Sequence, residues 1–398
     1  MIIKDNAIDG IRKLKHLGKF VHSGVVSPPY LWKQDYGIGD YVWEVRGHPP
    51  CEHEFSGRVS VGHNLWGVSF RRSQMWRNAQ ICSLCGAWKG QLGQEPIPEM
   101  YIAHLDNVFY EFYDILRDDG TLWVVIGDTA ISAKSRYSTK NDTILGGGRH
   151  DAKLGAMQDG MKPDLVGQSY FSDGAMAQIP AMLADRMQRG KWTLRSHIVW
   201  YKRVHKPESV VGWQWDRHAV NNIPCDGCSK CDNGFILKRN NGRPTIATES
   251  ILMFSKKNSR YFFDTDAVRE KNVSKDKNNN PFGKNVRNVW EIAPSHHRKH
   301  YATFPEELAR RCILASTSPA VCSNCGTPYA RIRELDKSTV GWRACCDCVG
   351  FTTSKSVVAD FFGGSGTTPF VARKNNREYL YIEPSELFVN IMQDRMNR

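Results

Sequence analysis

The stretch from residue 356 to residue 385, SVVADFFGGSGTTPFVARKNNREYLYIEPS, limits the choice of fold more than any other part of the chain. It has the pattern of an apolar strand that ends at Asp360, a glycine-rich turn, a helix from about Thr367, and a second apolar strand that ends at Glu383. Glycines let a ligand approach the backbone at a helix N-terminus, and an acid at the tip of the next strand can accept hydrogen bonds from ribose hydroxyls. This order predicts an α/β fold with a nucleoside-cofactor site. The glycine spacing departs from G-x-G-x-x-G and no second phosphate-binding element is visible, which disfavours a nicotinamide dehydrogenase.

The rest of the chain also alternates between helices and buried strands. Apolar residues recur at helical spacing from Met100 to Leu116, and Asp118-Asp119-Gly120 is predicted to end that helix. The run TLWVVIGD that follows is typical of a buried parallel strand. Helices alternating with such strands predict a mostly parallel sheet flanked by helices. The further predicted elements are a helix within 174–190, strands at 193–202 and 249–257, and a polar, glycine-rich mobile loop at 132–173.

A second informative stretch is VVSPPYLWK, residues 25 to 33, which places two prolines directly after a short apolar run. Proline fixes φ and removes a backbone donor, so a strand at Val25-Val26 should stop at Ser27-Pro28-Pro29 in a stiff corner. In an α/β sheet such a corner lies at the carboxyl edge, where ligands bind, and Tyr30 is expected to project into the crevice. Taken alone, the same residues could form an ordinary surface turn.

A surplus of basic residues narrows the choice of partner. The 398 residues include 54 Lys and Arg against 41 Asp and Glu, a formal charge of +13, which favours a polyanion such as nucleic acid. The chain has no apolar run of membrane-spanning length, and its first residues lack the apolar core of a signal peptide, so we expect no membrane partner and a cytoplasmic location. In that compartment the 12 cysteines indicate metal binding rather than disulfides.

Most of the cysteines fall into three clusters with the spacing of zinc ligands. Short C-x-x-C or C-x-H turns let each pair of ligands grip one ion, and four protein ligands around tetrahedral zinc leave no open position for catalysis. We therefore expect structural zinc. The cluster that begins at Cys225 shows only three cysteines, and its fourth ligand could be His218 or His205. The predicted ligands are Cys51, His53, Cys82 and Cys85 in the first cluster, Cys225, Cys228 and Cys231 in the second, and Cys322, Cys325, Cys346 and Cys348 in the third, with Cys345 spare.

Two motifs taken together resemble those of the amino-group DNA methyltransferases. Ser27-Pro28-Pro29-Tyr30 near the start and DFFGGSGTT at 360–368 stand in the permuted order of the beta class, in which the catalytic motif precedes the S-adenosylmethionine motif. The resemblance covers nearly the whole chain, because GQLGQEPIPEMY, LRDDGTLWVVIGD, LRSHIVWYK, RNVWEI and HYATFPEELARRCILAST are similar to family segments in matching order. It implies a Rossmann-like S-adenosylmethionine-dependent methyltransferase fold, here with small zinc-ribbon insertions. It also implies methyl transfer to N4 of cytosine or N6 of adenine in a base flipped out of double-stranded DNA.

The resemblance further implies roles for individual residues. The Ser27 side chain and the Pro28 carbonyl would accept hydrogen bonds from the target amine, Pro29 would stiffen the corner, and Tyr30 would stack on the base. Such acceptors favour pyramidal geometry at a nitrogen whose lone pair is otherwise delocalised into the ring. Asn6 lies in Asp5-Asn6-Ala7, where the family usually carries an acid. The residues implied to bind S-adenosylmethionine are Asn6, Thr303, Phe304, Pro305, Asp360, Phe362, Gly364, Ser365, Gly366, Thr367 and, on the ribose, Glu383.

The base and the partners follow from the same resemblance. Serine at the first position of the catalytic motif is found mostly in cytosine-N4 enzymes, so cytosine is the expected base, with adenine N6 as the second candidate. The chain could instead be a zinc-ribbon nucleic-acid-binding protein without catalysis, or a methyltransferase that acts on RNA or on a protein amine. A cognate restriction enzyme could accompany the protein in a bacterial or phage-infected cell, where we expect it to associate with the nucleoid. The oligomeric state is not predicted.

The insertions divide the expected methyltransferase domain into two halves. Basic residues between about 205 and 300, including Lys256-Lys257 and the HHRKH run at 296–300, can contact phosphates without reading a sequence. The predicted organisation is a catalytic half at 1–45 and 91–204, a zinc-ribbon-like insertion at 46–90, a target-recognition region at 205–300, an S-adenosylmethionine-binding half at 301–319 and 351–398, and a second ribbon-like insertion at 320–350.

Overall fold

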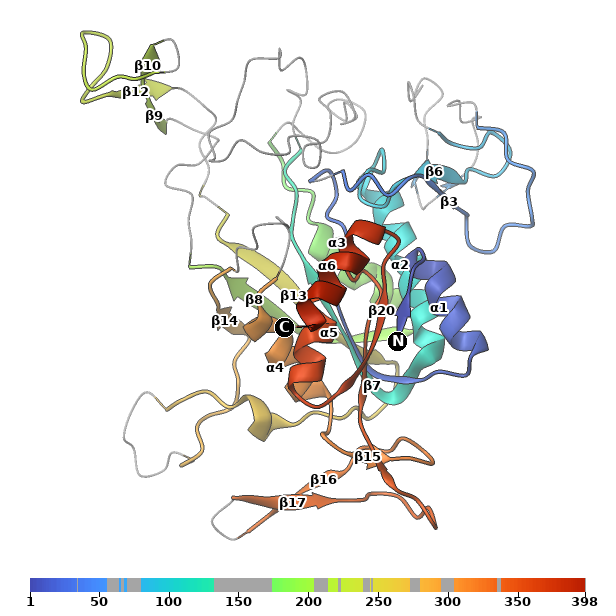
Figure 1. Ribbon diagram of the computed structural model, residues 1–398. Coiled ribbons are helices and arrows are strands. Elements are labelled where there is room, and N and C mark those ends of the chain that lie inside the picture. The colour runs from blue at the N-terminus through green and yellow to red at the C-terminus, as the bar shows by residue number, and fades with distance from the viewer. Residues whose placement is uncertain are drawn as a thin grey trace.

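An eight-stranded sheet forms the centre of the computed structural model (Figure 1). The structure describes residues 1–33, 35–55, 64–65, 68–69, 80–131, 174–203, 214–220, 223–238, 244, 246–272, 280–294, 304–334 and 338–397. All strands of the sheet run in one direction except β13, which is antiparallel to both of its neighbours, so the prediction of a mostly parallel sheet is confirmed. The strand order is β1 (Ile2–Ile3), β20 (Glu378–Ile382), β19 (Val357–Asp360), β2 (Val21–Val26), β7 (Leu116–Ile126), β13 (Thr248–Lys256), β8 (Trp192–Tyr201) and β14 (Val289–Glu291).

Helices cover both faces of the sheet, because each strand presents apolar side chains to both faces. In β7, Leu122 and Val124 pack on one side and Trp123 and Val125 on the other, because successive side chains of a strand point to opposite faces. The first face is covered by α1 (Ala7–His16), α2 (Pro98–Ile115) and α3 (Ile179–Arg189). The second face is covered by α4 (Glu306–Ser316), α5 (Thr367–Lys374) and α6 (Glu386–Met396), with the 3₁₀ turn η1 (Thr265–Val268) beside α4. No helix in the described part of the chain has both the length and the apolar character needed to cross a bilayer.

The junction between α2 and β7 differs from the prediction. The helix ends at Ile115 and β7 begins at the next residue, so Asp118-Asp119-Gly120 belongs to the strand and does not end the helix. Two contacts favour the extended conformation. Arg117 Nε donates to Asp119 Oδ1 at 2.8 Å, which joins two side chains on the same face of the strand. At Gly120, β2 comes so close that a Cβ would lie 2.8 Å from the carbonyl oxygen of His22.

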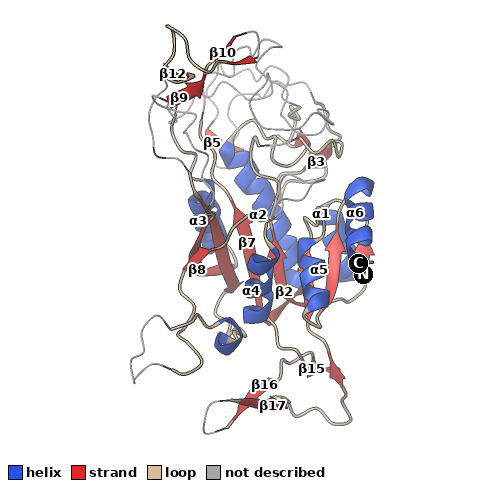
Figure 2. Cartoon of the chain, turned by 60° about the vertical axis from the view of Figure 1, so that its left-hand side comes forward, coloured by secondary structure: helices blue, strands red, loops and turns tan. Residues whose placement is uncertain are grey.

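Small hairpins extend from both ends of the sheet (Figure 2). These hairpins belong to three insertions, which we number in chain order. The first insertion follows the end of β2 and the second follows the end of β8, so both leave from the carboxyl edge of the sheet. The third joins the end of α4 to the start of β19 and leaves from the opposite edge. The first comprises β3 (Tyr41–Trp43), β4 (Asn64–Leu65), β5 (Val68–Ser69) and β6 (Trp88–Gly90), the second β9 (Gln214–Arg217), β10 (Ala219–Val220), β11 (Ile223–Pro224) and β12 (Phe235–Lys238), and the third β15 (Val321–Cys322), β16 (Ala330–Arg333), β17 (Thr339–Arg343) and β18 (Thr353–Ser354). The predicted loop at 132–173 and the HHRKH run lie outside the described residues.

Candidate functional site

A cavity of about 440 Å³ lies at the carboxyl ends of β2, β19 and β20 and joins the two ends of the sequence. Its wall includes residues of the Ser-Pro-Pro-Tyr corner and residues of the glycine loop, although these two motifs lie near opposite ends of the sequence. The predicted site residues that line the cavity are Asn6, Ser27, Pro29, Phe304, Phe362, Gly364, Ser365, Thr367 and Glu383. Pro28, Tyr30, Pro305, Asp360 and Gly366 lie next to these in the chain but do not line it, and Thr303 lies outside the described residues.

The Ser-Pro-Pro-Tyr corner is held from one side by α2 and the segment before it. The Tyr101 hydroxyl donates to the Pro29 carbonyl at 2.7 Å, and the Trp32 amide donates to the Gly93 carbonyl at 2.7 Å. Gly93 has a positive φ of 90°, and a Cβ there would lie 3.1 Å from the Tyr30 carbonyl oxygen. A residue with a side chain at 93 would therefore be strained and would press on the corner.

Tyr30 does not line the cavity itself, and its hydroxyl reaches the start of β13. Its hydroxyl donates to Glu249 Oε2 at 2.8 Å, and Glu249 forms an ion pair with Lys202 at the end of β8. The edge of the ring lies against Gly127, where a Cβ would be 2.8 Å from Cε2. Burial, and next to it the Glu249 carboxylate, raise the pKa of Tyr30 well above its ordinary value. The ring is thus fixed at its tip and at one edge.

The glycine loop, residues 361–366, begins directly after β19, and its backbone conformation requires glycine. The Phe362 amide donates to Asp360 Oδ1 at 3.2 Å, which turns the chain directly after the strand. Gly366 has a φ of 75°, and a Cβ there would lie 2.1 Å from Cγ of Met392 on α6. The Gly364 amide donates to Glu383 Oε2 at 2.8 Å, so the loop is joined to the end of β20.

Two buried carboxyl groups, Asp360 and Glu383, stand at this end of the cavity. Burial raises the pKa of Asp360 to about 7 and that of Glu383 to about 7. The Ser385 amide gives Glu383 a second backbone donor, to Oε1 at 2.9 Å. A cationic or hydroxyl-bearing ligand would stabilise the ionised forms of both groups, because an opposite charge or a hydrogen-bond donor favours the charged state.

Asn6 has a clear structural function at the start of α1. Its Oδ1 accepts the Asp9 amide at 3.0 Å, which caps the helix, and its Nδ2 donates to Asp9 Oδ2 at 2.7 Å. The neighbouring Asp5 lines the cavity as well and is ion-paired with Lys13 at 2.5 Å. Both candidates for the acid that the family usually carries thus lie in the cavity wall.

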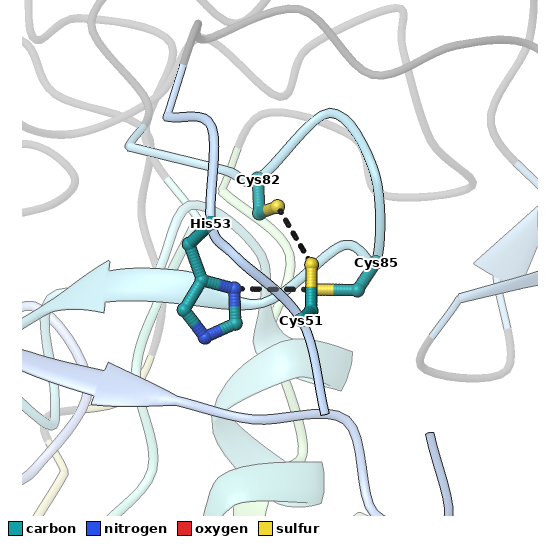
Figure 3. Close-up of side chains that lie close together, drawn as sticks. All are labelled: Cys51, His53, Cys82 and Cys85. Atoms are coloured by element: carbon teal, nitrogen blue, oxygen red, sulfur yellow. Dashed lines mark hydrogen bonds between the residues drawn. The ribbon is translucent and has the colours of Figure 1, made fainter. Parts of the chain in front are cut away.

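The structure brings the predicted cysteines together in three sets of four ligands, and within each set all ligand atoms lie within 4.8 Å of one another. In the first set Cys51 Sγ lies 3.9 Å from Cys82 Sγ, and Cys85 Sγ lies 3.3 Å from His53 Nδ1 (Figure 3). Tetrahedral zinc with Zn–S bonds of about 2.3 Å places its sulfur ligands roughly 3.8 Å apart, so this spacing fits the ion. The second set takes His218 as its fourth ligand, and the third uses Cys346 and Cys348, with Cys345 outside the set.

Sequence reasoning missed several residues of the site. Tyr36, Tyr41 and Trp43 line the cavity from the segment that follows the corner, and burial raises the pKa of Tyr36 to about 12. The aromatic residues of YGIGDYVW were a usable signal for them. Glu249 carried no such signal, because it meets Tyr30 only through the pairing of β13 with β7 and β8.

A buried pair behind the corner was also missed. Glu95 Oε1 lies 2.9 Å from His104 Nδ1, and the side chains of both residues are fully buried. Burial raises the pKa of Glu95 to about 8 and lowers that of His104 well below its ordinary value. The His104 ring stacks between Trp43 and Trp88, with centroid distances of 4.8 and 5.5 Å. The pair therefore connects the β3–β6 hairpin to the segment that holds the corner.

Sequence comparisons match the chain to DNA methyltransferases. The family model described as DNA methylase, N6_N4_Mtase, matches residues 21–394. The Type II methyltransferase M.Cfr9I of Citrobacter freundii is 30% identical over 311 residues, which are 77% of this chain and 74% of that protein. The Type II methyltransferase M.SmaI of Serratia marcescens is 28% identical over 313 residues, 78% of each chain.

Two solved structures match this chain along most of its length at low sequence identity. The PvuII DNA methyltransferase (cytosine-N4-specific) is 13% identical with a TM-score of 0.47, over 99% of this chain and 85% of that chain. M1.HpyAVI is 11% identical with a TM-score of 0.44, over 100% and 98% of the two chains. The match of the family model to nearly the whole chain, with the M.Cfr9I relative beside it, decides the family. This chain belongs to the N6/N4 DNA methylase family and is an S-adenosylmethionine-dependent DNA methyltransferase.

Proposed function

We propose that this enzyme methylates the exocyclic N4 of cytosine in a base flipped out of duplex DNA, at a specific site. One observation carries the proposal. Ser27 and Pro29 of the catalytic motif line the same cavity as Phe362 and Glu383 of the cofactor motif, so a nucleophile held at the corner would face a methyl donor held at the glycine loop. The relatives named as Type II methyltransferases support site-specific DNA modification beside a cognate restriction enzyme.

The corner supplies the groups that such a reaction needs. The lone pair of an exocyclic amine is delocalised into the base, and acceptors for its N–H groups make it more available in the transition state. In our proposal Ser27 Oγ and the Pro28 carbonyl are these acceptors. Pro29 keeps the corner rigid, helped by the Tyr101 hydrogen bond on its carbonyl, and the Tyr30 ring offers a stacking surface for the flipped base.

The residues at the other end of the cavity fit S-adenosylmethionine, which supplies the methyl group. Glu383 would accept hydrogen bonds from the ribose hydroxyls, as acids at this strand end do in nucleoside-binding folds. Asp360, Phe362, Gly364, Ser365, Gly366 and Thr367 would surround the methionine part, and the positive φ of Gly364 and Gly366 lets backbone come close to it. Asn6, Phe304 and Pro305 complete the proposed cofactor set, with Thr303 as the predicted neighbour outside the described residues.

The choice of cytosine depends on Ser27. A neutral hydroxyl accepts a hydrogen bond more weakly than a carboxylate does. Among the amino-group DNA methyltransferases that the chain resembles, serine at this position is typical of the cytosine-N4 enzymes. Adenine N6 would be methylated by the same mechanism. Product analysis distinguishes the two bases directly.

We further propose that each of the three ligand sets holds one structural zinc ion. Each set is complete with four protein ligands, which is the donor set of a closed structural site. The first two sets belong to insertions at the carboxyl edge, on the same side as the corner, and in our proposal these insertions contact DNA. The target-recognition region would begin with the second insertion.

The test is incubation of the purified protein with mixed-sequence duplex DNA and S-adenosylmethionine, followed by digestion to nucleosides and mass analysis. We expect N4-methylcytosine, and its loss in Ser27→Ala and Tyr30→Ala. In parallel, Glu383→Gln should weaken cofactor binding in calorimetry by about 10- to 100-fold, the loss expected for a hydrogen bond to a charged group. N6-methyladenine would overturn the choice of base, and no methylated nucleoside from DNA of varied sequence would overturn the proposal.

A further inference from the structure

The first set of cysteine and histidine ligands stands at one end of the hairpin formed by β3 and β6. Cys51 and His53 follow β3 in the chain, and Cys82 and Cys85 precede β6 (Figure 3). The turn that carries Cys82 and Cys85 is closed by a backbone hydrogen bond from the Cys82 amide to the Ala87 carbonyl at 2.7 Å, and β6 begins at the next residue. The ligand set therefore joins the two strands of the hairpin at this end.

The other end of the hairpin is part of the cavity wall. In the antiparallel register Trp43 pairs with Trp88, and Tyr41 pairs with Gly90. The Trp43 indole donates to the Gly90 carbonyl at 3.0 Å, which adds a side-chain bond across the two strands. Tyr41, Trp43 and Gly90 line the cavity, and Gln91 continues the wall beyond the end of β6. One short hairpin thus connects the ligand set to the cavity.

The same wall reaches the end of the cavity that holds Glu383. The Ile38 amide donates to Gln91 Oε1 at 3.3 Å, which joins the segment before β3 to the end of β6. From that segment, Tyr36 contacts Phe388 on α6, with ring centroids 6.3 Å apart. Burial raises the pKa of Tyr36 to about 12, and the nearby Glu383 carboxylate adds to this shift. All five residues line the cavity, so the wall supported by the hairpin extends to the proposed ribose acceptor.

We propose that zinc bound by the first set orders this wall and thereby sets the affinity for S-adenosylmethionine. The proposal rests on the cofactor site and the zinc ions proposed above, and it gives one of the three ions a role in substrate binding. β3 and β6 have three residues each, and a two-stranded hairpin without other support is marginally stable in water. Because zinc binds the assembled ligands and not the unfolded segment, its binding free energy becomes folding free energy of the hairpin.

The third set provides a comparison within the same chain. Its insertion joins α4 to β19 at the opposite edge of the sheet, and no described residue of that insertion lines the cavity. Loss of zinc there should therefore leave cofactor binding unchanged. Packing is the competing support for the wall, because the His104 ring is stacked between Trp43 and Trp88. If packing alone held the hairpin, loss of zinc from the first set would leave cofactor binding unchanged as well.

The experiment compares Cys85→Ser in the first set with Cys325→Ser in the third set and with Cys345→Ser, which lies outside the three sets. Elemental analysis should give one zinc ion fewer than wild type in Cys85→Ser and in Cys325→Ser, and the wild-type content in Cys345→Ser. Calorimetry without DNA should give a dissociation constant for S-adenosylmethionine about tenfold or more above wild type in Cys85→Ser, as expected if the wall is ordered in about a tenth of the molecules. The other two variants should keep the wild-type value.

Hydrogen exchange separates a local effect from general unfolding. In Cys85→Ser the amides of β3 and β6 should exchange faster than in wild type, while those of β2, β7 and β19 keep their rates. An unchanged affinity for S-adenosylmethionine despite the loss of zinc, an equal loss of affinity in Cys325→Ser, or faster exchange throughout the sheet would overturn the proposal. A wild-type protein that binds S-adenosylmethionine but makes no methylated nucleoside would overturn the proposed function alone, and the loss of affinity in Cys85→Ser would still support the role of zinc.

Discussion

The Thr368 hydroxyl donates to the carbonyl of Val25 at 2.9 Å. Thr368 lies in the first turn of α5, directly after the glycine loop, and Val25 lies on β2 two residues before Ser27. Both residues are fully buried. The bond therefore joins the element that carries the cofactor motif to the strand that carries the catalytic motif, and it fixes the distance across the cavity between them.

Thr368→Val should disturb both motifs at once. Valine nearly matches the volume of threonine but cannot donate, so the carbonyl of Val25 loses a buried partner at a cost of about 1–3 kcal/mol in the free energy of unfolding. We expect weaker S-adenosylmethionine binding and slower methyl transfer together with this loss of stability. Urea unfolding and calorimetry provide the measurement, with the exposed Thr352→Val as control. A variant as stable and as active as wild type would show that the bond does not connect the motifs.

Glu383 should give the cofactor-free protein a distinctive dependence on pH. Burial raises its pKa to about 7 from the ordinary value of 4.5, so the folded state binds the proton more tightly than the unfolded state. Stability is therefore fully present below about pH 4.5 and declines as the pH rises to about 7. Glu383→Gln removes this contribution, and its stability relative to wild type should increase across that window by an amount on the order of 1–3 kcal/mol.

The measurement for Glu383 is urea unfolding at a series of pH values from 4 to 8, with the difference between variant and wild type plotted against pH. Exposed Glu334→Gln is the control and should give a flat difference. A flat difference for Glu383→Gln as well would show that folding does not raise the pKa of this carboxyl group.

The sequence predicted most of the sheet because its strands carry strong local signals. The apolar runs at 121–126 and 357–359 lie in the centre of the sheet; glycines flank the first run, and Asp360 and the glycine loop follow the second. The boundary between α2 and β7 was wrong because Asp118-Asp119-Gly120 resembles a turn locally. In the fold, the Arg117–Asp119 ion pair and the close approach of β2 to Gly120 select an extended chain instead.

The site was predictable to the extent that its residues lie within motifs. The corner and the glycine loop each have a local sequence pattern, and the fold brings them to one cavity. Glu249, Glu95 and His104 have no pattern of their own, because each acts through a contact that exists only after the strands and helices have packed. Their pKa shifts and partners arise from burial, which a sequence does not report position by position.

Glu95→Ala should loosen the catalytic corner without touching the cavity. Glu95 Oε2 accepts the Gly93 amide at 2.8 Å, its carbonyl accepts the Trp32 indole at 2.7 Å, and Gly93 lies against the corner. Removing the carboxyl group leaves buried donors without an acceptor, at a cost of about 1–3 kcal/mol in unfolding free energy. We expect the rate constant of methyl transfer to fall while the dissociation constant for S-adenosylmethionine stays near the wild-type value.

The control for Glu95 is Asp185→Ala on α3, whose ion pair with Arg189 is exposed. Single-turnover rates and calorimetric affinities give the two readouts. A loss of cofactor affinity equal to the loss of rate would contradict the prediction, since it would show a general loosening of the cavity and not a displacement of the corner alone.

The three ligand sets should differ in their effect on DNA binding. Elemental analysis of protein purified without chelator is expected to give three zinc ions per chain, and a serine at Cys228 or at Cys325 should each remove one. The Cys228 set belongs to the insertion after β8, at the carboxyl edge with the corner, whereas the Cys325 set extends from the opposite edge (Figure 1). We therefore expect duplex DNA bound at the corner to reach the Cys228 set but not the Cys325 set.

Cys228→Ser should accordingly weaken duplex binding by about tenfold or more, equal to about 1.4 kcal/mol. Cys325→Ser should leave the affinity for DNA unchanged and lower the melting temperature. The turn at Cys325 packs against the sheet: Arg117 on β7 donates to the Cys325 carbonyl, and Nε2 of His22 on β2 lies 2.9 Å from the Gly326 carbonyl oxygen. Fluorescence anisotropy with labelled duplex at fixed salt gives the affinities, and calorimetry gives the melting temperatures. Equal losses of DNA affinity in the two variants would mean that the third insertion also acts on DNA, either directly or through the arrangement of the sheet.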